Sequence, residues 1–544
     1  MDAVLVLAGG EVIDCAAGVA PVRRRADVVC DGGRVVSVIP GGGALPAAAL
    51  GAEVLDCAGL VVAPGFIDTH AHTDLALASP SAGALPMKIL QGVTTDVVGQ
   101  DGLSVAPLDQ AAAVRDELRW LVGDPADVAW GWRDVAGYLA AIDAARPALS
   151  AAYLVPHGAL RTLALGRGAE ARRPGPDDVA RMCSALRAGL AAGALGLSTG
   201  LIYEPCLHAD SAELTALCRE VAAVSGLFAV HLRSESDDLL AATEEVLGIA
   251  RASGVQLHLS HMKILGQRNV HLCDAWLALL EAARADGVHV TGDQYPYTAS
   301  STSLGQLLPR WAQAGGAGEA TRRLGDAAER ARIRRAIEAP SAEDGPSSWL
   351  RTGPEAIMIA DVPSGRRPEV VGKNLCEAAG AAGQGGDVLG FVLDLLAAER
   401  LAVSMITFSQ DEAVVERILK LPWVNLCTDG LLGGRPHPRT WGSFPRVLGR
   451  YVRERGVLTL EQAVHKLSAQ AADAMGLHER GRVVAGAAAD LVVFDAARVL
   501  DVATFADPAR GPVGIEHVVV AGQVAVRAGA ATGVRAGAAL RARR

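Results

Sequence analysis

Short apolar segments alternate with longer amphipathic stretches through the middle of this 544-residue chain, and this alternation limits its possible folds more than any other feature. The short segments have the β-branched, apolar character of buried strands, and the stretches between them carry apolar residues at helical spacing. Eight strands are predicted, at 65–70, 94–98, 152–156, 195–199, 227–231, 256–260, 288–293 and 423–428. Alternating β and α units in this number favour a closed parallel (β/α)₈ barrel of the TIM type over an open doubly wound sheet.

The two ends of the chain are β-rich in a different way, with short strands broken by glycine over 1–60 and again over 483–535. We therefore expect a small β-sandwich domain built from both termini and a barrel domain over 61–482. The segment 294–422 is too long for an ordinary loop, and we expect it to be an insertion covering the mouth of the barrel. The last residues, 536–544, are expected to be loosely ordered.

Composition excludes several classes of protein. The net charge is -9 and no basic stripe is present, which argues against a nucleic-acid partner. The N-terminus has no basic region ahead of an apolar run, and no later run reaches the ~18 apolar residues of a membrane span, so we expect a cytoplasmic protein without membrane contact. Nine scattered cysteines contain no CxxC pair, which argues against a disulfide framework. The sequence does not predict the oligomeric state.

Histidines and aspartates follow the predicted strands at the ends where a barrel carries its active site. His70 and His72 end the first strand, and since strand side chains alternate, both imidazoles lie on one face and can share a metal ion. Single residues follow four later strands: Asp101, His231, His261 and Asp429. Each of these alone is equally well explained as a helix cap or loop residue. Four histidines and two aspartates at five strand ends, however, predict a metal site.

Other histidines are set apart from this group. His157 ends the third strand, where a supporting role, a substrate contact and a purely structural role all remain open. His258 shares a strand with His261 but points to the opposite face. His289 lies near the start of its strand, at the wrong end for the site. His258 and His289 are therefore left out of the predicted site.

The order of these residues resembles that of the amidohydrolase superfamily, and within it the N-acyl-D-amino-acid deacylases, or D-aminoacylases. The closer resemblance rests on motifs spread over nearly the whole chain, at 65–74, 193–205, 260–263, 293–298 and 437–448. It implies a metal-dependent hydrolase that cleaves the amide bond of N-acyl-D-amino acids to give a carboxylate and a free D-amino acid. Selectivity for the D form enters only through this resemblance.

The resemblance implies Zn²⁺, with one ion bound tightly and a second position of lower affinity. The tight site would be formed by Asp101, His231 and His261. The adjacent position would be outlined by His70, His72 and Asp429. The family typically has Asn-Cys-Gly where this chain has Gln100-Asp101-Gly102. Since a carboxylate is a harder ligand than a thiolate, the metal preference can shift toward Mn or Co.

The same resemblance implies roles in catalysis and substrate binding. Asp429 would take the proton of the attacking water and return it to the leaving amine. Lys263 points to the same side as His261 by strand alternation, and Arg439 offers a planar fork for a carboxylate. Together with the hydroxyl of Tyr203, they match positions that bind the substrate carboxylate in the family. The alternative interpretation of Arg439 is a surface salt bridge.

Two alternatives to deacylation remain. A cyclic amide hydrolase, acting on hydantoins, dihydropyrimidines or lactams, could share the barrel. Hydantoinases and related members carry a carboxylated lysine on the fourth strand that bridges two metal ions. Residues 194–199 contain no lysine, which argues against this alternative without eliminating it. A catalytically inactive scaffold is the other, and the presence of all six metal and base residues argues against it.

Overall fold

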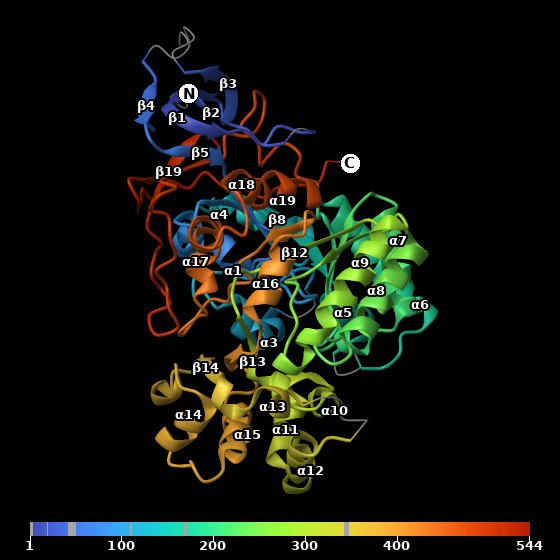
Figure 1. Ribbon diagram of the computed structural model, residues 1–544. Coiled ribbons are helices and arrows are strands. Elements are labelled where there is room, and N and C mark those ends of the chain that lie inside the picture. The colour runs from blue at the N-terminus through green and yellow to red at the C-terminus, as the bar shows by residue number, and fades with distance from the viewer. Residues whose placement is uncertain are drawn as a thin grey trace.

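The computed structural model describes residues 4–18, 20–41, 51–108, 111–167, 171–341 and 347–543. Three parts follow one another along the molecule: a β-sheet unit at the top of Figure 1, a barrel in the middle and a helical unit at the bottom. No helix in these ranges combines the length and apolarity needed to cross a membrane.

The barrel is formed by all eight predicted strands. They make one parallel sheet in the order β16-β12-β11-β10-β9-β8-β7-β6. The strands are β6 (Phe66–Asp68), β7 (Val93–Val98), β8 (Ser150–Pro156), β9 (Gly196–Gly200), β10 (Leu227–His231), β11 (Gln256–Leu259), β12 (Val290–Gln294) and β16 (Val424–Leu426). At the seam between β16 and β6, the amide of Asp429 donates to the carbonyl of His70 at 2.9 Å. The predicted barrel is confirmed.

Helices follow most of these strands and pack their apolar faces against the barrel. Along the chain they are α1 (Asp74–Leu77), α2 (Pro86–Ile89), α3 (Ala111–Val122), α4 (Val135–Ala145), α5 (His157–Leu165), α6 (Pro176–Ala191), α7 (Ser211–Ala222), α8 (Leu239–Ser253), α9 (Cys273–Ala285), α16 (Glu412–Leu419), α17 (Arg439–Arg446), α18 (Leu460–Leu467) and α19 (Ala469–Ala474). Asp134, Asp210 and Asp411 each accept a hydrogen bond from an amide in the first turn of the helix that follows. These caps fix where α4, α7 and α16 begin.

The sheet unit joins both ends of the chain. Its strands are β1 (Leu5–Ile13), β2 (Arg23–Asp31), β3 (Arg34–Pro40), β4 (Glu53–Asp56), β5 (Val61–Pro64), β17 (Leu491–Phe494), β18 (Ile515–Val520), β19 (Gln523–Arg527) and β20 (Ala530–Ala531). β5 pairs antiparallel with β17, which explains why the two distant segments fold together. All nine strands are hydrogen-bonded into one continuous sheet, and they do not divide into two separately hydrogen-bonded layers.

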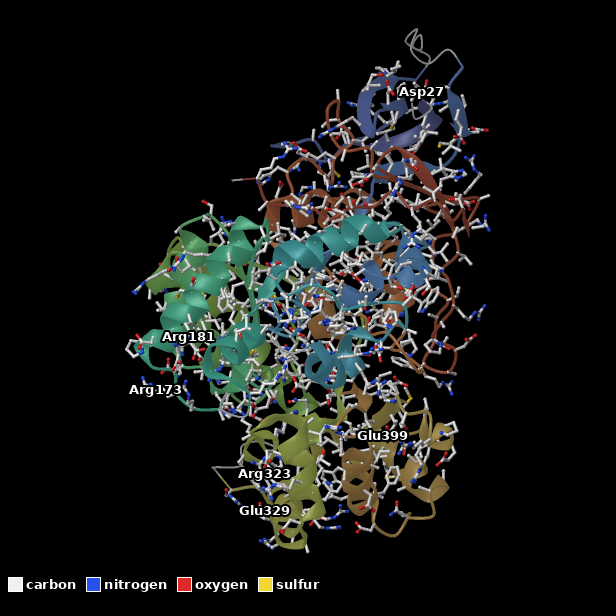
Figure 2. All side chains as sticks on the ribbon, turned by 180° about the vertical axis from the view of Figure 1, so that it is seen from behind. Asp27, Arg173, Arg181, Arg323, Glu329 and Glu399 are labelled. Carbon is white, nitrogen blue, oxygen red and sulfur yellow. The ribbon has the colours of Figure 1, made fainter. Side chains whose placement is uncertain are left out.

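The segment between β12 and β16 folds as a unit with its own apolar core. A three-stranded sheet consists of β13 (Ala299–Ser303), β14 (Ile357–Asp361) and β15 (Ser404–Phe408). Its helices are α10 (Arg310–Gln313), α11 (Gly316–Gly325), α12 (Ala327–Glu338), α13 (Ser348–Thr352), α14 (Leu375–Ala381) and α15 (Val388–Ala398). Figure 2 shows this unit from behind, with Arg323 and Glu329 labelled on α11 and α12.

The expectation of a loose C-terminal end is wrong for residues 536–543. The amide of Leu540 donates to the carbonyl of Ala151 at 2.7 Å, and the amide of Ala151 donates to the carbonyl of Ala538 at 3.0 Å. Leu540 and Ala542 also pack against buried residues of the barrel. Backbone pairing of this kind leaves no pattern in the side chains, so the sequence alone did not reveal it.

Candidate metal centre

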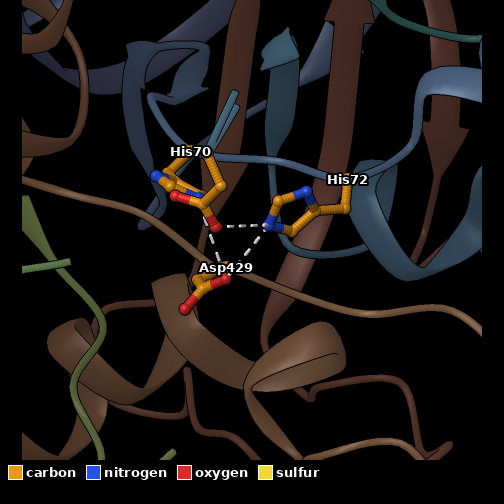
Figure 3. Close-up of side chains that lie close together, drawn as sticks. His70, His72 and Asp429 are labelled. Atoms are coloured by element: carbon orange, nitrogen blue, oxygen red, sulfur yellow. Dashed lines mark ion pairs between the residues drawn. The ribbon is translucent and has the colours of Figure 1, made fainter. Parts of the chain in front are cut away.

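The six predicted residues converge at the carboxyl ends of the barrel strands, although they come from positions up to 359 residues apart in the chain. They form two overlapping groups, and within each group the potential ligand atoms all lie within 4.8 Å of one another. The first group is His70, His72, Asp101 and Asp429, and the second is Asp101, His231 and His261. Figure 3 shows His70, His72 and Asp429 facing one another. All six side chains are buried.

Asp101 belongs to both groups and presents a different oxygen to each. Its Oδ2 lies 3.5 Å from His70 Nε2 and 3.7 Å from His72 Nε2. Its Oδ1 lies 3.5 Å from His261 Nε2 and 3.8 Å from His231 Nδ1. These separations are longer than hydrogen bonds, so they leave room between the atoms. Asp101 would therefore contribute a carboxylate oxygen to each of the two groups that could hold a metal ion.

Buried atoms without partners show that these residues fit a metal ion. Within the described part of the chain, both ring nitrogens of His70, His72 and His231, and Oδ1 of Asp101, are buried and accept or donate no hydrogen bond. Most buried polar atoms in proteins are hydrogen-bonded, so a cluster of this kind points to a ligand. Burial lowers the pKa of His231 to about 4, which keeps its imidazole in the neutral form that binds metal. An imidazole and carboxylate set suits zinc.

Three of the six residues have left-handed backbone conformations, which cost side-chain-bearing residues about 1–3 kcal/mol each. The φ angles are 57° at Asp101, 36° at His261 and 46° at Asp429. Asp293, at the end of β12, holds one of them in place by accepting a hydrogen bond from the amide of His261 at 2.5 Å. Strain that the surrounding structure maintains is typical of functional sites.

Glu235 contacts two of the imidazoles on the side that faces away from Asp101, and the sequence did not identify it as a site residue. Its Oε1 lies 3.1 Å from His261 Nδ1, and its Oε2 lies 3.6 Å from His231 Nε2. Each ring therefore faces Asp101 with one nitrogen and Glu235 with the other, as is usual where a carboxylate orients a metal-binding histidine. Burial opposes ionisation of Glu235, but His231 and Lys263 lower its pKa to about 2. In the sequence Glu235 lies in a polar run before α8, where it resembles an ordinary helix-start residue.

Lys263, predicted as a substrate contact, lies beside this carboxylate. Its Nζ is 2.5 Å from Glu235 Oε1 and 2.7 Å from His261 Nδ1. It also donates to the carbonyl of His261 at 3.1 Å. The ammonium group thus has three contacts inside the protein, and it holds Glu235 against His261.

Arg439 and Asp429 form a buried ion pair at the edge of the cluster. Arg439 Nη1 lies 3.0 Å from Asp429 Oδ2, while Asp429 Oδ1 faces His72 Nε2 at 3.3 Å. Burial raises the pKa of Asp429, but Arg439 and the neighbouring imidazoles outweigh it and hold this pKa well below the usual range of a carboxyl group. The guanidinium also stacks on Tyr295, 4.4 Å from the ring centre. Arg439 is fully buried, so the surface salt-bridge interpretation is wrong.

The remaining predicted residues lie around the cluster. Tyr203, on the loop after β9, shares a hydrogen bond of 2.9 Å with Thr302 of β13. His157 lies in a separate buried group, with Nε2 2.9 Å from Glu213 and Nδ1 2.9 Å from Thr199. Both ring nitrogens of His157 therefore have partners outside the two groups that could hold a metal ion.

A buried lysine lies beneath the metal-binding residues. Lys88 of α2 contacts Asp68 Oδ2 of β6 and donates to Thr428 Oγ1 at 2.9 Å. Its Nζ is also 3.4 Å from Asp96 Oδ1 of β7. The side chains of Lys88, Asp68 and Asp96 are fully buried. Asp68 in turn accepts the amide of Thr428 at 2.9 Å, so this group ties the first and last barrel strands together next to Asp429.

Known proteins resemble this chain over most of its length. The profile of the amidohydrolase family matches residues 53–348 and 395–526. The N-acyl-D-glutamate deacylase of Alcaligenes xylosoxydans xylosoxydans is 39% identical over 95% of this chain and 92% of its own length. The D-aminoacylase of the same organism is 36% identical over 98% of this chain and 96% of its own length.

A solved structure agrees over the full length of both chains. The crystal structure of N-acyl-D-glutamate deacylase from Bordetella bronchiseptica, complexed with zinc and a phosphonate inhibitor that mimics the tetrahedral intermediate, has a TM-score of 0.82 and 36% sequence identity. It covers 100% of this chain and 100% of its own. The profile match, the two curated relatives and this structure agree over the regions that supply all six clustered residues. The chain therefore belongs to the amidohydrolase family.

Proposed function

We propose that the protein is a zinc-dependent hydrolase that cleaves the amide bond of N-acyl-D-amino acids, releasing a carboxylate and a free D-amino acid. The observation that carries this proposal is the convergence of four imidazoles and two carboxylates with buried nitrogens that have no hydrogen-bond partner. The relatives named N-acyl-D-glutamate deacylase and D-aminoacylase support the substrate class.

In this proposal Asp101, His231 and His261 hold the tighter metal ion, and His70, His72 and Asp429 outline the second position, with Asp101 shared. Bound zinc supplies a Lewis acid that polarises the amide carbonyl and lowers the pKa of water toward ~7. Asp429 is the general base. Since its Oδ2 is held by Arg439, Oδ1 is the atom that takes the proton of the attacking water and returns it to the leaving amine.

The substrate carboxylate needs donors near Asp429. Arg439 Nε has no hydrogen-bond partner among the described residues, so the guanidinium keeps an N–H for a substrate carboxylate. Tyr203 and Lys263 are the other two residues that we propose bind the substrate carboxylate. Because Lys263 already makes three contacts inside the protein, it attracts the carboxylate through its positive charge. The Tyr203 hydroxyl is hydrogen-bonded to Thr302.

Replacing Asp101 is expected to change metal binding in a way that depends on the new side chain. Asp101→Ala removes the shared ligand, so zinc retained after dialysis, measured by mass spectrometry, should fall and the affinity should weaken by more than about 100-fold. Asp101→Cys should retain zinc and, after cobalt substitution, add thiolate-to-cobalt absorption that the original protein lacks. Unchanged metal content in Asp101→Ala would show that Asp101 is not a ligand.

A substrate panel on protein of measured metal content tests the function. N-acetyl-D-amino acids, their L forms, hydantoins and dihydropyrimidines are assayed side by side. The proposal expects release of free amine from the D series and little turnover of the cyclic amides. β9 (Gly196–Gly200) carries no lysine to bridge two metals, which agrees with this expectation. Turnover confined to the cyclic compounds would replace the proposal with the ring-opening alternative.

A further inference from the structure

A cavity of about 150 Å³ opens beside the metal-binding residues. It is lined by His231 from the cluster and by Arg351 from α13, so it joins the candidate metal centre to the unit inserted between β12 and β16. Its barrel side is formed by the loop after β10, including Glu235 and Ser236. A substrate held at the metal therefore has room to extend one of its groups into this space.

The charges that line the cavity are mostly positive. Its charged residues in the described part of the chain are Arg233, Arg310, Arg351 and Glu235, beside the imidazole of His231. Glu235 is already paired with Lys263 at 2.5 Å. Arg233 is matched by two contacts of 2.9 Å with Glu245. Among the described lining residues, Arg310 and Arg351 have no matching carboxylate on the cavity wall.

Arg351 is the cation that faces this space from a buried position. Its side chain is only 9% exposed, and among the described residues the nearest acidic partner is Asp237, at 4.0 Å. Asp237 is itself held by Arg268 at 2.7 Å. In the part of the chain that the structure describes, Arg351 donates to two hydroxyl groups, those of Ser236 at 3.2 Å and Ser348 at 2.6 Å.

The guanidinium of Arg351 also has an unused donor. Its Nε is buried and has no hydrogen-bond partner in the described part of the chain. A buried cation is costly without a counter-charge, and a planar guanidinium is suited to binding a carboxylate through two N–H groups. The hydroxyls of Ser300 and Thr407 on the same wall are hydrogen-bonded to each other, so this pair has one further O–H to donate to a carboxylate.

We infer that this cavity binds the side chain of the substrate, and that Arg351 selects N-acyl-D-amino acids with an acidic side chain over neutral ones. The inference rests on the proposed function and names its substrate class. The acyl group then has a separate space, a cavity of about 380 Å³ on the Tyr203 side that is partly lined by Leu118 and Trp120. Arg351 acts on specificity and takes no part in the chemistry at the metal.

Two substrates that differ only in charge test this inference. N-acetyl-D-glutamate and N-acetyl-D-glutamine have nearly the same shape, and the original protein should prefer the glutamate by about 100-fold in kcat/KM, the size expected for an ion pair in a buried site. In Arg351→Gln this preference should disappear through loss of activity on the glutamate, while kcat/KM for the glutamine stays within about threefold. Arg351→Lys keeps the charge and should retain part of the preference.

Arg322→Gln is the matched control, because Arg322 lies on α11 of the same inserted unit but is 60% exposed and pairs with Glu319 on the same helix. It should leave both substrates unaffected. Equal turnover of glutamate and glutamine by the original protein, or an equal loss of both in a folded Arg351→Gln, overturns the inference while leaving the proposed function intact. Failure to hydrolyse any N-acetyl-D-amino acid overturns both.

Discussion

Asp429→Asn should lower kcat by about 10²–10⁴-fold, the usual contribution of a positioned general acid and base. Asparagine keeps the shape of the side chain but cannot take the proton of the attacking water. The backbone of residue 429 remains held by the hydrogen bond from its amide to the carbonyl of His70. Steady-state kinetics on an N-acetyl-D-amino acid, with circular dichroism to check the fold, measure the effect.

Measuring the metal content distinguishes loss of the general base from loss of a metal ligand as the cause of the lower kcat. Asp429 lies in only one of the two groups, so the group formed by Asp101, His231 and His261 should keep its zinc in the variant. Asp501→Asn is a matched control, because Asp501 also pairs with an arginine, Arg446 at 3.0 Å, but lies outside both groups. An Asp429→Asn enzyme that keeps its zinc and most of its activity would rule out the assigned role.

Lys88→Met should destabilise the barrel by about 3–5 kcal/mol, because removing one partner of a buried ion pair leaves the other charge uncompensated. Here two carboxylates, Asp68 and Asp96, lose the same cation. Burial and Asp68 already raise the pKa of Asp96 to about 6, although Lys88 lowers it. Thermal unfolding at fixed metal content should show a fall in Tm of several degrees.

A second substitution tests the cause of that fall. Lys88→Met combined with Asp96→Asn removes one of the unpaired charges and should recover part of the lost stability. Lys420→Met removes an exposed lysine at the end of α16 and should leave Tm unchanged. A Lys88→Met protein as stable as the original would show that the lysine does not stabilise the seam between β6 and β16.

The sequence predicted those parts of the fold that leave a repeating pattern in the side chains. Most barrel strands are apolar segments followed by an amphipathic stretch, and strand-end residues such as His231 and Asp429 stand out against this pattern. Closure of the barrel then brings the strand ends together, so the six clustered residues could be predicted without knowing any distance.

Features that depend on three-dimensional contacts escaped this reasoning. Glu235 lies in a polar run, and only the turn after β10 directs it to the far side of two imidazoles. Strand alternation predicts Lys263 on the same side as His261, and its Nζ lies 2.7 Å from His261 Nδ1. Its pairing with Glu235, however, depends on a residue 28 positions away. The pairing of Arg439 with Asp429 likewise follows from the position of α17, which no local pattern specifies.

The central claim is that residues distant in the chain hold a metal ion at the mouth of the barrel. Diffraction from crystals of the zinc-loaded protein, recorded on both sides of the zinc absorption edge, tests it most directly. The account predicts an anomalous peak within about 2.0–2.2 Å of a carboxylate oxygen of Asp101 and of nitrogens of His231 and His261. A peak at other residues, or none in protein incubated with zinc, would contradict it.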